Sequence, residues 1–188
     1  MTIKPAIFRA YDIRGVVGET LTMDTAYLIG LSYAELLEDK SCPVIVCRDG
    51  RLTSPELSKN LMRGLIDGGA DVLDIGIGPT PMLYFAVHTL DSVGGIMVTG
   101  SHNPPTHNGF KMMRGKRALF GDDIQAIYEK CLVFENKEIK AISKMPAKGY
   151  VENYVETLLN SAAEPTRELK IAWDPGNGAA GEVVAELT

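Results

Sequence analysis

The sequence predicts an α/β fold in which short apolar strands alternate with helices. Three segments have the length and apolar character of buried strands, and two segments between them have helical periodicity: 43–47, 72–77 and 96–98 for the strands, 54–67 and 80–90 for the helices. Both helical segments open with a hydroxyl residue followed by proline, Ser54-Pro55 and Thr80-Pro81, which is typical of an N-cap and a first helical turn. The order strand–helix–strand–helix–strand predicts a parallel central sheet with right-handed crossovers.

The residues before this unit predict one further helix. In the segment 22–37, apolar residues such as Ala26, Ile29 and Tyr33 recur at helical spacing, and we expect their shared face to lie in the core. The segment 8–18 mixes aromatic, charged and glycine residues, and no strand is predicted there. The N-terminal part is therefore expected to add one helix to the fold.

After the unit, the sequence predicts a hairpin and then a helix. Asn108-Gly109 is a strong turn pair, so the hairpin is expected to start at residue 110, to turn near Arg114-Gly115-Lys116 and to end at residue 120. Residues 122–134 follow helical periodicity with Ile124, Ile127 and Cys131 facing inward. Both elements would extend the same domain.

The last quarter of the chain predicts the start of a second, similar domain. The segment 135–149 is polar, contains a proline and has little pattern, so we place the boundary there, with residues 1–146 as the first domain and 147–188 as the beginning of the second. Beyond it we expect a helix at 150–162, a strand at 169–173 and a glycine-rich turn at 174–181 that leads into another helix.

Composition excludes several classes of partner. A hydrophobic content of 45% is enough for a substantial core. A net charge of −5 and a pI near 5.2 argue against nucleic acid or an anionic membrane as the main partner. No segment has the apolar length of a bilayer span or of a signal peptide. Three cysteines without motif spacing are most simply reduced thiols, so we expect a cytoplasmic location.

A polar loop follows the apolar strand 96–98. The loop, Thr99-Gly100-Ser101-His102-Asn103-Pro104-Pro105, is dense in turn-forming residues. Taken alone, such a cluster is more often a tight connection than a binding site. However, ligands in open α/β sheets bind beyond the carboxyl ends of strands, which is where Ser101 is expected to lie. The histidines lack common zinc spacings, and no Gly-x-Ser-x-Gly motif indicates acyl transfer.

The residues of the loop suit a phosphate group. Ser101 offers a hydroxyl that could carry phosphate, and backbone N–H groups around it could form an anion-binding nest. A phosphate would add about −1.5 to −2 charges and three acceptor oxygens. His102 and Lys111 are cations, or proton carriers, within reach in the sequence. Such a group needs nearby donors and positive charge, and the sequence supplies both.

Several motifs, in order and spacing, resemble those of the α-D-phosphohexomutases. They extend along nearly the whole chain: FRAYDIRG at 8–15, CRDGR at 47–51, GPTP at 78–81, TGSHNPP at 99–105, NGFK at 108–111 and DPGNGAAG at 174–181. The YDIRG and TGSHNP variants are most similar to the phosphomannomutase/phosphoglucomutase branch. The resemblance implies a three-layer α/β/α domain with a mixed, mainly parallel sheet, followed by the start of the second domain.

The resemblance also implies a reaction, in which a phosphoserine and a hexose bisphosphate interconvert hexose 1-phosphate and hexose 6-phosphate. By this resemblance Ser101 carries the phosphoryl group. Lys111 is the expected general base on the attacking hydroxyl, and His102 assists proton movement or binds the phosphate. The partner would be mannose or glucose 1- or 6-phosphate and its bisphosphate.

The remaining implied site residues bind phosphate and shape the loop. Arg14 would stabilise the transferring group, because its fork suits phosphate oxygens. Tyr11 would line the substrate site with Arg14 and Lys111, and Asn103 would shape the loop and help to bind the phosphate. Mg2+ would be the cofactor, held here only through the phosphate on Ser101, because the family's acidic metal loop is not in this chain.

Two other interpretations of the sequence stay open. The chain could be a non-catalytic phosphate-binding or interaction module, or, within the family, belong to a phosphoglucosamine mutase. The family's metal, sugar and distal-phosphate motifs do not occur here, so we expect an N-terminal part that is inactive alone. The strand expected at 169–173 has no sheet of its own, and exchange of this strand between two copies could give a homodimer.

Overall fold

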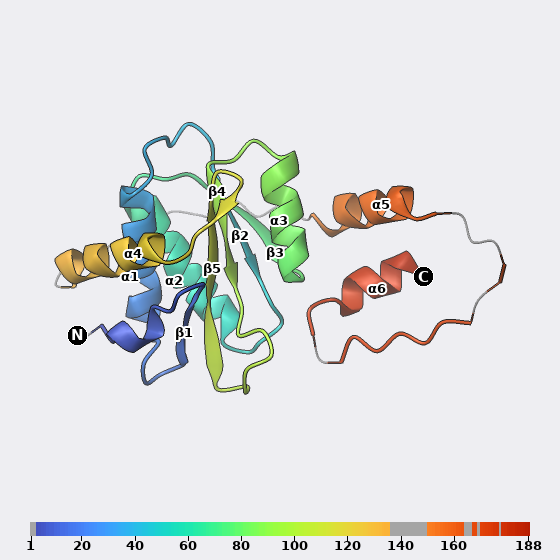
Figure 1. The fold of residues 1–188 in the computed structure, drawn as a ribbon, viewed down its shortest axis with the longest axis horizontal. Coiled ribbons are helices and arrows are strands. Elements are labelled where there is room, and N and C mark those ends of the chain that lie inside the picture. The colour runs from blue at the N-terminus through green and yellow to red at the C-terminus, as the bar shows by residue number, and fades with distance from the viewer. Residues whose placement is uncertain (1–2, 136–149, 164–166, 169, 177) are drawn as a thin grey trace.

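The computed structural model describes residues 3–135, 150–163, 167–168, 170–176 and 178–188. A sheet forms the middle layer, and helices cover both of its faces (Figure 1). Helices α1 (Met23–Glu35), α2 (Ser54–Asp67) and α4 (Asp122–Phe134) lie on one face, and α3 (Thr80–Thr89) lies on the other. This arrangement confirms the predicted three-layer α/β/α fold.

The sheet is mixed. Its strands are β1 (Ile13–Val16), β2 (Val44–Arg48), β3 (Val72–Ile77), β4 (Gly94–Val98), β5 (His107–Arg114) and β6 (Arg117–Ala118). Their order is β1-β5-β4-β2-β3, with β6 paired to β5. Strand β2 is parallel to β3 and β4, whereas β5 is antiparallel to β1, β4 and β6. Among the described strands, β5 alone therefore runs against the common direction, which confirms a mixed, mainly parallel sheet.

Two apolar layers hold the domain together. On the α1–α2–α4 side, side chains such as Tyr27, Leu61 and Phe110 are fully buried. On the α3 side, Ile45 and Met97 from the sheet pack with residues of α3. Strand β4 is buried along its whole length because it contributes to both layers. The strand that leads into the Ser101 loop is thus the most enclosed part of the sheet.

Helices α1 and α2 approach each other through two glycines. A Cβ atom at Gly30 would overlap the carbonyl oxygen of Leu61, and a Cβ atom at Gly64 would overlap that of Tyr27. Backbones can come this close only where no side chain separates them. This contact holds α2 close against α1, and it therefore fixes the position of the first turn of α2.

The predicted helices are present, but two of the expected N-caps are wrong. Ser54 and Thr80 are the first residues of α2 and α3, and the cap positions are Thr53 and Pro79, whose side chains make no capping hydrogen bond. The Ser54 hydroxyl instead donates to Asp49 at 2.6 Å, a contact between loop and helix that its local sequence does not reveal. In α1, Thr22 does cap the helix and accepts from the Thr25 amide at 3.1 Å.

Strand β1 was not predicted, and Asn108-Gly109 is not a turn. Both residues lie inside β5, where Gly109 pairs with Arg14 of β1 and Asn108 pairs with Gly15. A Cβ at residue 109 would overlap the carbonyl oxygen of Ile13, so the glycine permits close strand approach rather than a turn. The hairpin itself is confirmed, and β5 and β6 are joined through Gly115.

The C-terminal helices are confirmed as α5 (Val151–Ser161) and α6 (Gly181–Leu187), but the strand expected at 169–173 is not formed in the described residues. Ile171 and Trp173 are 61% and 54% exposed. An isolated strand has no partner for its backbone groups, which accounts for its absence. The boundary segment 136–149 lies outside the described residues, so the division into domains stays a prediction.

The described helices include none long and apolar enough to cross a membrane. All three cysteines are free thiols, and two of them are enclosed by the core. Burial raises the pKa of the Cys47 thiol to about 12, and it does the same for Cys131, to which Ser32 donates a hydrogen bond of 3.2 Å. Both thiols are therefore protonated at neutral pH.

The glycine contact predicts that Gly30→Ala destabilises the domain by at least about 2 kcal/mol, because a new methyl group would have to displace backbone. Gly181→Ala is the control, since a Cβ there meets no atom within 4 Å. Urea unfolding followed by circular dichroism measures both free energies of unfolding. Equal midpoints for Gly30→Ala and the parent protein would contradict the close helix packing.

Thiol alkylation is predicted to distinguish the cysteines. At pH 8 a thiol of pKa about 12 is thiolate in only about one molecule in 10,000, and Cys47 and Cys131 are also enclosed. We expect iodoacetamide to modify only Cys42 in the folded protein, and all three cysteines after unfolding. Mass spectrometry counts the labels, and rapid labelling of Cys47 without denaturant would contradict this packing.

Candidate active site

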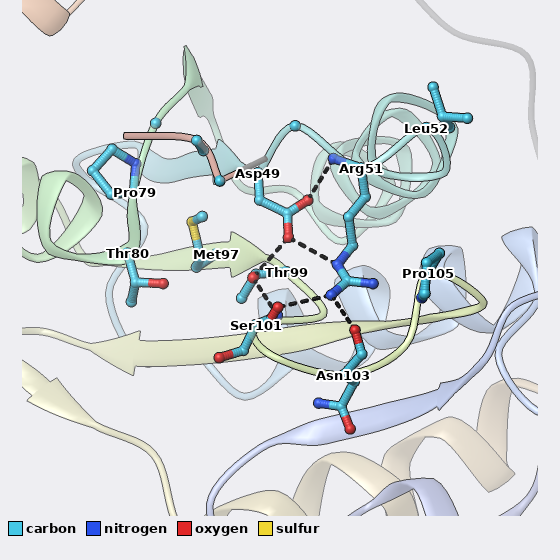
Figure 2. A pocket seen from close by; sticks show the side chains of 14 residues that line it. Asp49, Arg51, Leu52, Pro79, Thr80, Met97, Thr99, Ser101, Asn103 and Pro105 are labelled. Carbon is cyan, nitrogen blue, oxygen red and sulfur yellow. Dashed lines mark hydrogen bonds and ion pairs between the residues drawn. The ribbon is translucent and has the colours of Figure 1, made fainter. Parts of the chain in front are cut away.

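A cleft of about 550 Å³ lies where β2, β3 and β4 end. Its walls come from the residues that follow the carboxyl ends of these three parallel strands: 49–52 after β2, 78–80 after β3, and 99–105 after β4. Met97 of β4, with Gly178 and Ala179, completes the lining. This is the position at which open α/β sheets bind ligands, and Ser101 lies on the cleft wall as predicted (Figure 2).

Ser101 has a constrained backbone and an exposed side chain. Its φ of 52° is the one positive φ of a non-glycine residue in the described part of the chain. This left-handed conformation costs a residue with a side chain about 1–2 kcal/mol. The Ser101 amide donates to the Thr99 hydroxyl at 2.8 Å, and the Ser101 Oγ lies 3.4 Å from Nδ1 of His102. The surroundings hold the serine with its hydroxyl directed to the cleft.

Asp49, immediately after β2, binds the start of the loop. Its Oδ2 accepts from the Thr99 hydroxyl at 2.8 Å and from the Gly100 amide at 3.1 Å. Its Oδ1 accepts from the Arg51 amide at 3.1 Å and from the Ser54 hydroxyl at 2.6 Å. One carboxylate thus joins the end of β2, the first turn of α2 and the beginning of the loop.

Arg51 binds the rest of the loop through its guanidinium group. Its guanidinium donates to four backbone carbonyl oxygens, those of Ser101 at 2.7 Å, Asn103 at 2.6 Å, Pro104 at 2.7 Å and His107 at 3.0 Å. Its Nε also lies 3.4 Å from the Asp49 carboxylate (Figure 2). A Cβ at Gly100 would overlap the guanidinium, so a glycine at this position leaves the space that Arg51 needs to contact the loop.

Two amide side chains complete the support of the loop. The Asn103 side chain and backbone N–H both donate to the Gly100 carbonyl, at 2.8 and 3.1 Å. Asn108 is fully buried, and its amide donates to the hydroxyls of Thr53 and Ser54, each at 2.9 Å. Loop, helix α2 and strand β5 are therefore connected by one set of hydrogen bonds.

A second polar cluster lies on the neighbouring strands β1 and β5. Asp12, only 9% exposed, contacts two cations, with its Oδ2 2.6 Å from Arg14 and 3.3 Å from Lys111. The antiparallel register of β1 and β5 brings these side chains together. Tyr11, just before β1, is 77% exposed and points away from the core.

The structure groups the predicted site residues into two sets. Ser101, His102 and Asn103 share the loop, whereas Arg14 and Lys111 share the carboxylate of Asp12. In the described residues no hydrogen bond or ion pair links the sets directly. They are connected through β5, which carries Lys111 and whose Gly109 carbonyl accepts from the Thr99 amide at 2.9 Å.

Sequence reasoning missed Asp12, Asp49 and Arg51 as site residues. Asp49 and Arg51 lie in the CRDGR motif, so their position after a predicted strand was a usable signal. Asp12, just before β1, and Arg14, within it, are two residues apart and so lie on the same side of the extended chain, but that signal depends on recognising the strand. Their roles depend on partners 50 or more positions away in the sequence.

A magnesium ion is not accommodated by these residues alone. The described part of the chain contains no group of three His, Cys, Asp or Glu side chains arranged to hold a metal. Asp49 is the carboxylate that contacts the Ser101 loop, and both of its oxygens already accept hydrogen bonds. A phosphate on Ser101 would add oxygen ligands of the type that Mg2+ prefers, but the other ligands would have to come from elsewhere.

Comparison with known proteins identifies close relatives of this domain. The sequence model of "Phosphoglucomutase/phosphomannomutase, alpha/beta/alpha domain I" matches residues 5–138. A phosphomannomutase/phosphoglucomutase of Pseudomonas aeruginosa is 42% identical over 188 residues, and a phosphoglucomutase of Neisseria meningitidis is 43% identical over 185 residues. These matches cover 99% and 96% of this chain but only 40% and 39% of the relatives.

A solved structure shows the same relationship. The crystal structure of a phosphoglucomutase/phosphomannomutase family protein from Burkholderia thailandensis superposes with a TM-score of 0.89 at 38% sequence identity. The superposition covers 99% of this chain and 42% of that protein. The chain therefore spans about two fifths of the length of the relatives it matches.

The loop network predicts that Asp49→Asn lowers the free energy of unfolding by about 2–3 kcal/mol, because an amide cannot accept from all the donors that the carboxylate serves. Asp91→Asn, at an exposed position, is the control for loss of one negative charge. Urea unfolding of the two variants measures the difference. Equal stability of both would show that Asp49 does not bind the loop as described.

Proposed function

The chain belongs to the phosphoglucomutase/phosphomannomutase family, and on this basis we propose that it carries the phosphoserine of an intramolecular phosphotransferase. The reaction would interconvert hexose 1-phosphate and hexose 6-phosphate, with mannose or glucose as the sugar. The observation that carries the proposal is Ser101, an exposed hydroxyl in a left-handed backbone conformation at the carboxyl end of β4.

Ser101 is the proposed carrier because its loop is fixed while its hydroxyl is accessible. Phosphoryl transfer depends mainly on positioning and on neutralising charge. In the first half-reaction the bond between Ser101 Oγ and phosphorus breaks, and a bond forms between phosphorus and a hydroxyl oxygen of the hexose monophosphate. The bisphosphate sugar then reorients and returns its other phosphoryl group to Ser101, so that no phosphate is gained or lost.

Lys111 is the proposed general base for the attacking hydroxyl. Its Nζ lies 3.3 Å from Asp12, which holds the side chain in place, and its amine would take the proton of the attacking hydroxyl. On the return step the proton moves back to the oxygen that loses phosphorus. His102, whose ring lies 3.4 Å from the Ser101 hydroxyl, assists proton movement or binds the phosphate.

Arg14 and the loop supply binding groups for phosphate. The Arg14 guanidinium, 2.6 Å from Asp12, is held on β1 and would stabilise the transferring group. Tyr11 is exposed next to it and would line the substrate site, and Asn103 shapes the loop through Gly100. Mg2+ would supply charge neutralisation when bound through the phosphate on Ser101.

The first test is direct detection of phosphate on Ser101. Intact-mass measurement and peptide mapping, after incubation with glucose 1,6-bisphosphate, are expected to place a single phosphate on this residue, and Ser101→Ala should remove it. A protein that binds hexose phosphate but never carries phosphate would instead be the non-catalytic phosphate-binding module. Phosphate on another residue, with Ser101→Ala fully active, would contradict the carrier assignment.

Lys111→Met, in the protein as its gene encodes it, is predicted to lower mutase turnover at least about 100-fold, the low end for general acid–base catalysis. Lys116→Met is the matched control, because Lys116 is exposed at the hairpin turn of the same strand pair. A coupled assay from mannose 1-phosphate or glucose 1-phosphate measures turnover. A Lys111→Met rate close to that of the control would remove Lys111 from the proposed mechanism.

A further inference from the structure

The contacts of Arg51 fix the directions of the loop's carbonyl groups. Four carbonyl oxygens between residues 101 and 107 turn inward to one guanidinium, and each lies 2.6 to 3.0 Å from it. Carbonyl oxygens carry partial negative charge and would repel a phosphate. Because each of these oxygens accepts a hydrogen bond from Arg51, the guanidinium offsets their partial negative charge and holds them in fixed directions next to Ser101.

Arg51 is itself fixed in position. Its side chain is only 17% exposed, its Nε lies 3.4 Å from Asp49, and its own amide donates to the same carboxylate. Gly100 leaves the space that the guanidinium fills. The planar fork of arginine can reach several acceptors at once, whereas a lysine ammonium could reach one or two of them.

We propose that Arg51 is a positioning residue for phosphoryl transfer, which holds Ser101 in its left-handed conformation and offsets the partial negative charge of the loop carbonyls. The inference rests on the proposed function of Ser101 as phosphate carrier. Arg51 acts through the loop backbone, since its side chain contacts carbonyl oxygens and Asp49 rather than the Ser101 hydroxyl.

The main test is made in the protein as its gene encodes it, called the parent protein here, and compares Arg51→Lys and Arg51→Ala with the parent and with Arg167→Met, which removes an exposed arginine elsewhere. Displacement of a reacting group by about 1 Å can cost about 100-fold in rate. We therefore expect the kcat of both Arg51 variants to fall about 100-fold, the KM for hexose phosphate to change less than threefold, and Arg167→Met to match the parent protein.

Two further measurements separate positioning from general loss of folding. Amide hydrogen exchange of residues 99–107 should accelerate at least tenfold in Arg51→Lys, while the exchange of β2 and β4 stays within twofold of the parent. Added guanidinium ion, at concentrations that leave the fold intact, should restore part of the kcat of Arg51→Ala, and urea at the same concentration should not.

Gly100→Ala provides an independent variant that keeps Arg51 in the protein. Its new methyl group would overlap the guanidinium and displace it from the loop carbonyls. We therefore expect the same loss of kcat with little change in KM. This variant also tests the inference if Arg51→Ala does not fold.

The outcomes distinguish this inference from the proposed function. An active parent protein whose Arg51→Lys and Gly100→Ala variants keep kcat within threefold would overturn the positioning role and leave the phosphoserine assignment intact. A kcat loss that only follows the fraction of unfolded protein would overturn it as well. A parent protein with neither phosphate on Ser101 nor turnover would instead overturn the proposed function, and the hydrogen-exchange result would still decide whether Arg51 holds the loop.

Discussion

The pairing of Asp49 with Arg51 is the interaction on which the Ser101 loop depends. The two side chains lie just after β2. The carboxylate accepts hydrogen bonds from N–H and hydroxyl groups of the loop, and the guanidinium donates to its carbonyl oxygens. A loop rich in turn-forming residues has many conformations available to it. Pairing the backbone groups of Gly100, Ser101, Asn103 and Pro104 with fixed partners favours one conformation, including the unfavourable φ of Ser101.

The sheet order explains why this pair can reach the loop at all. Strands β2 and β4 are parallel neighbours, and Arg48 pairs with Val98, so the residues that follow both strands emerge side by side. The apolar layers on either side of β4 hold that register, because a shift would bring polar residues into the core. The packing of α1 on α2 through Gly30 and Gly64 keeps the first turn of α2, with Ser54, in contact with Asp49.

Strand β5 brings the second set of proposed site residues next to the strand that carries the Ser101 loop. It pairs with β4 on one side and β1 on the other, and it runs against both. That arrangement sets Lys111 and Arg14 around Asp12, beside the strand that carries the loop. Two cations share one nearly buried carboxylate, so this cluster has one net positive charge when phosphate is absent. A phosphorylated ligand would meet groups that are already in place, which lowers the cost of ordering them on binding.

Local sequence by itself determined the helices, the parallel strands, the β5–β6 hairpin and the position of Ser101 after β4, because each depends on periodicity or on turn-forming residues close in the chain. The tertiary structure alone decided the rest. Asn108-Gly109 reads locally as a turn, but the need for close contact with β1 makes it part of a strand. Segment 170–173 has the apolar character of a strand, but without a neighbour in the described residues it forms none. The roles of Asp12, Asp49 and Arg51 likewise depend on partners distant in sequence, and such pairings exist only once the sheet has brought the strand ends together.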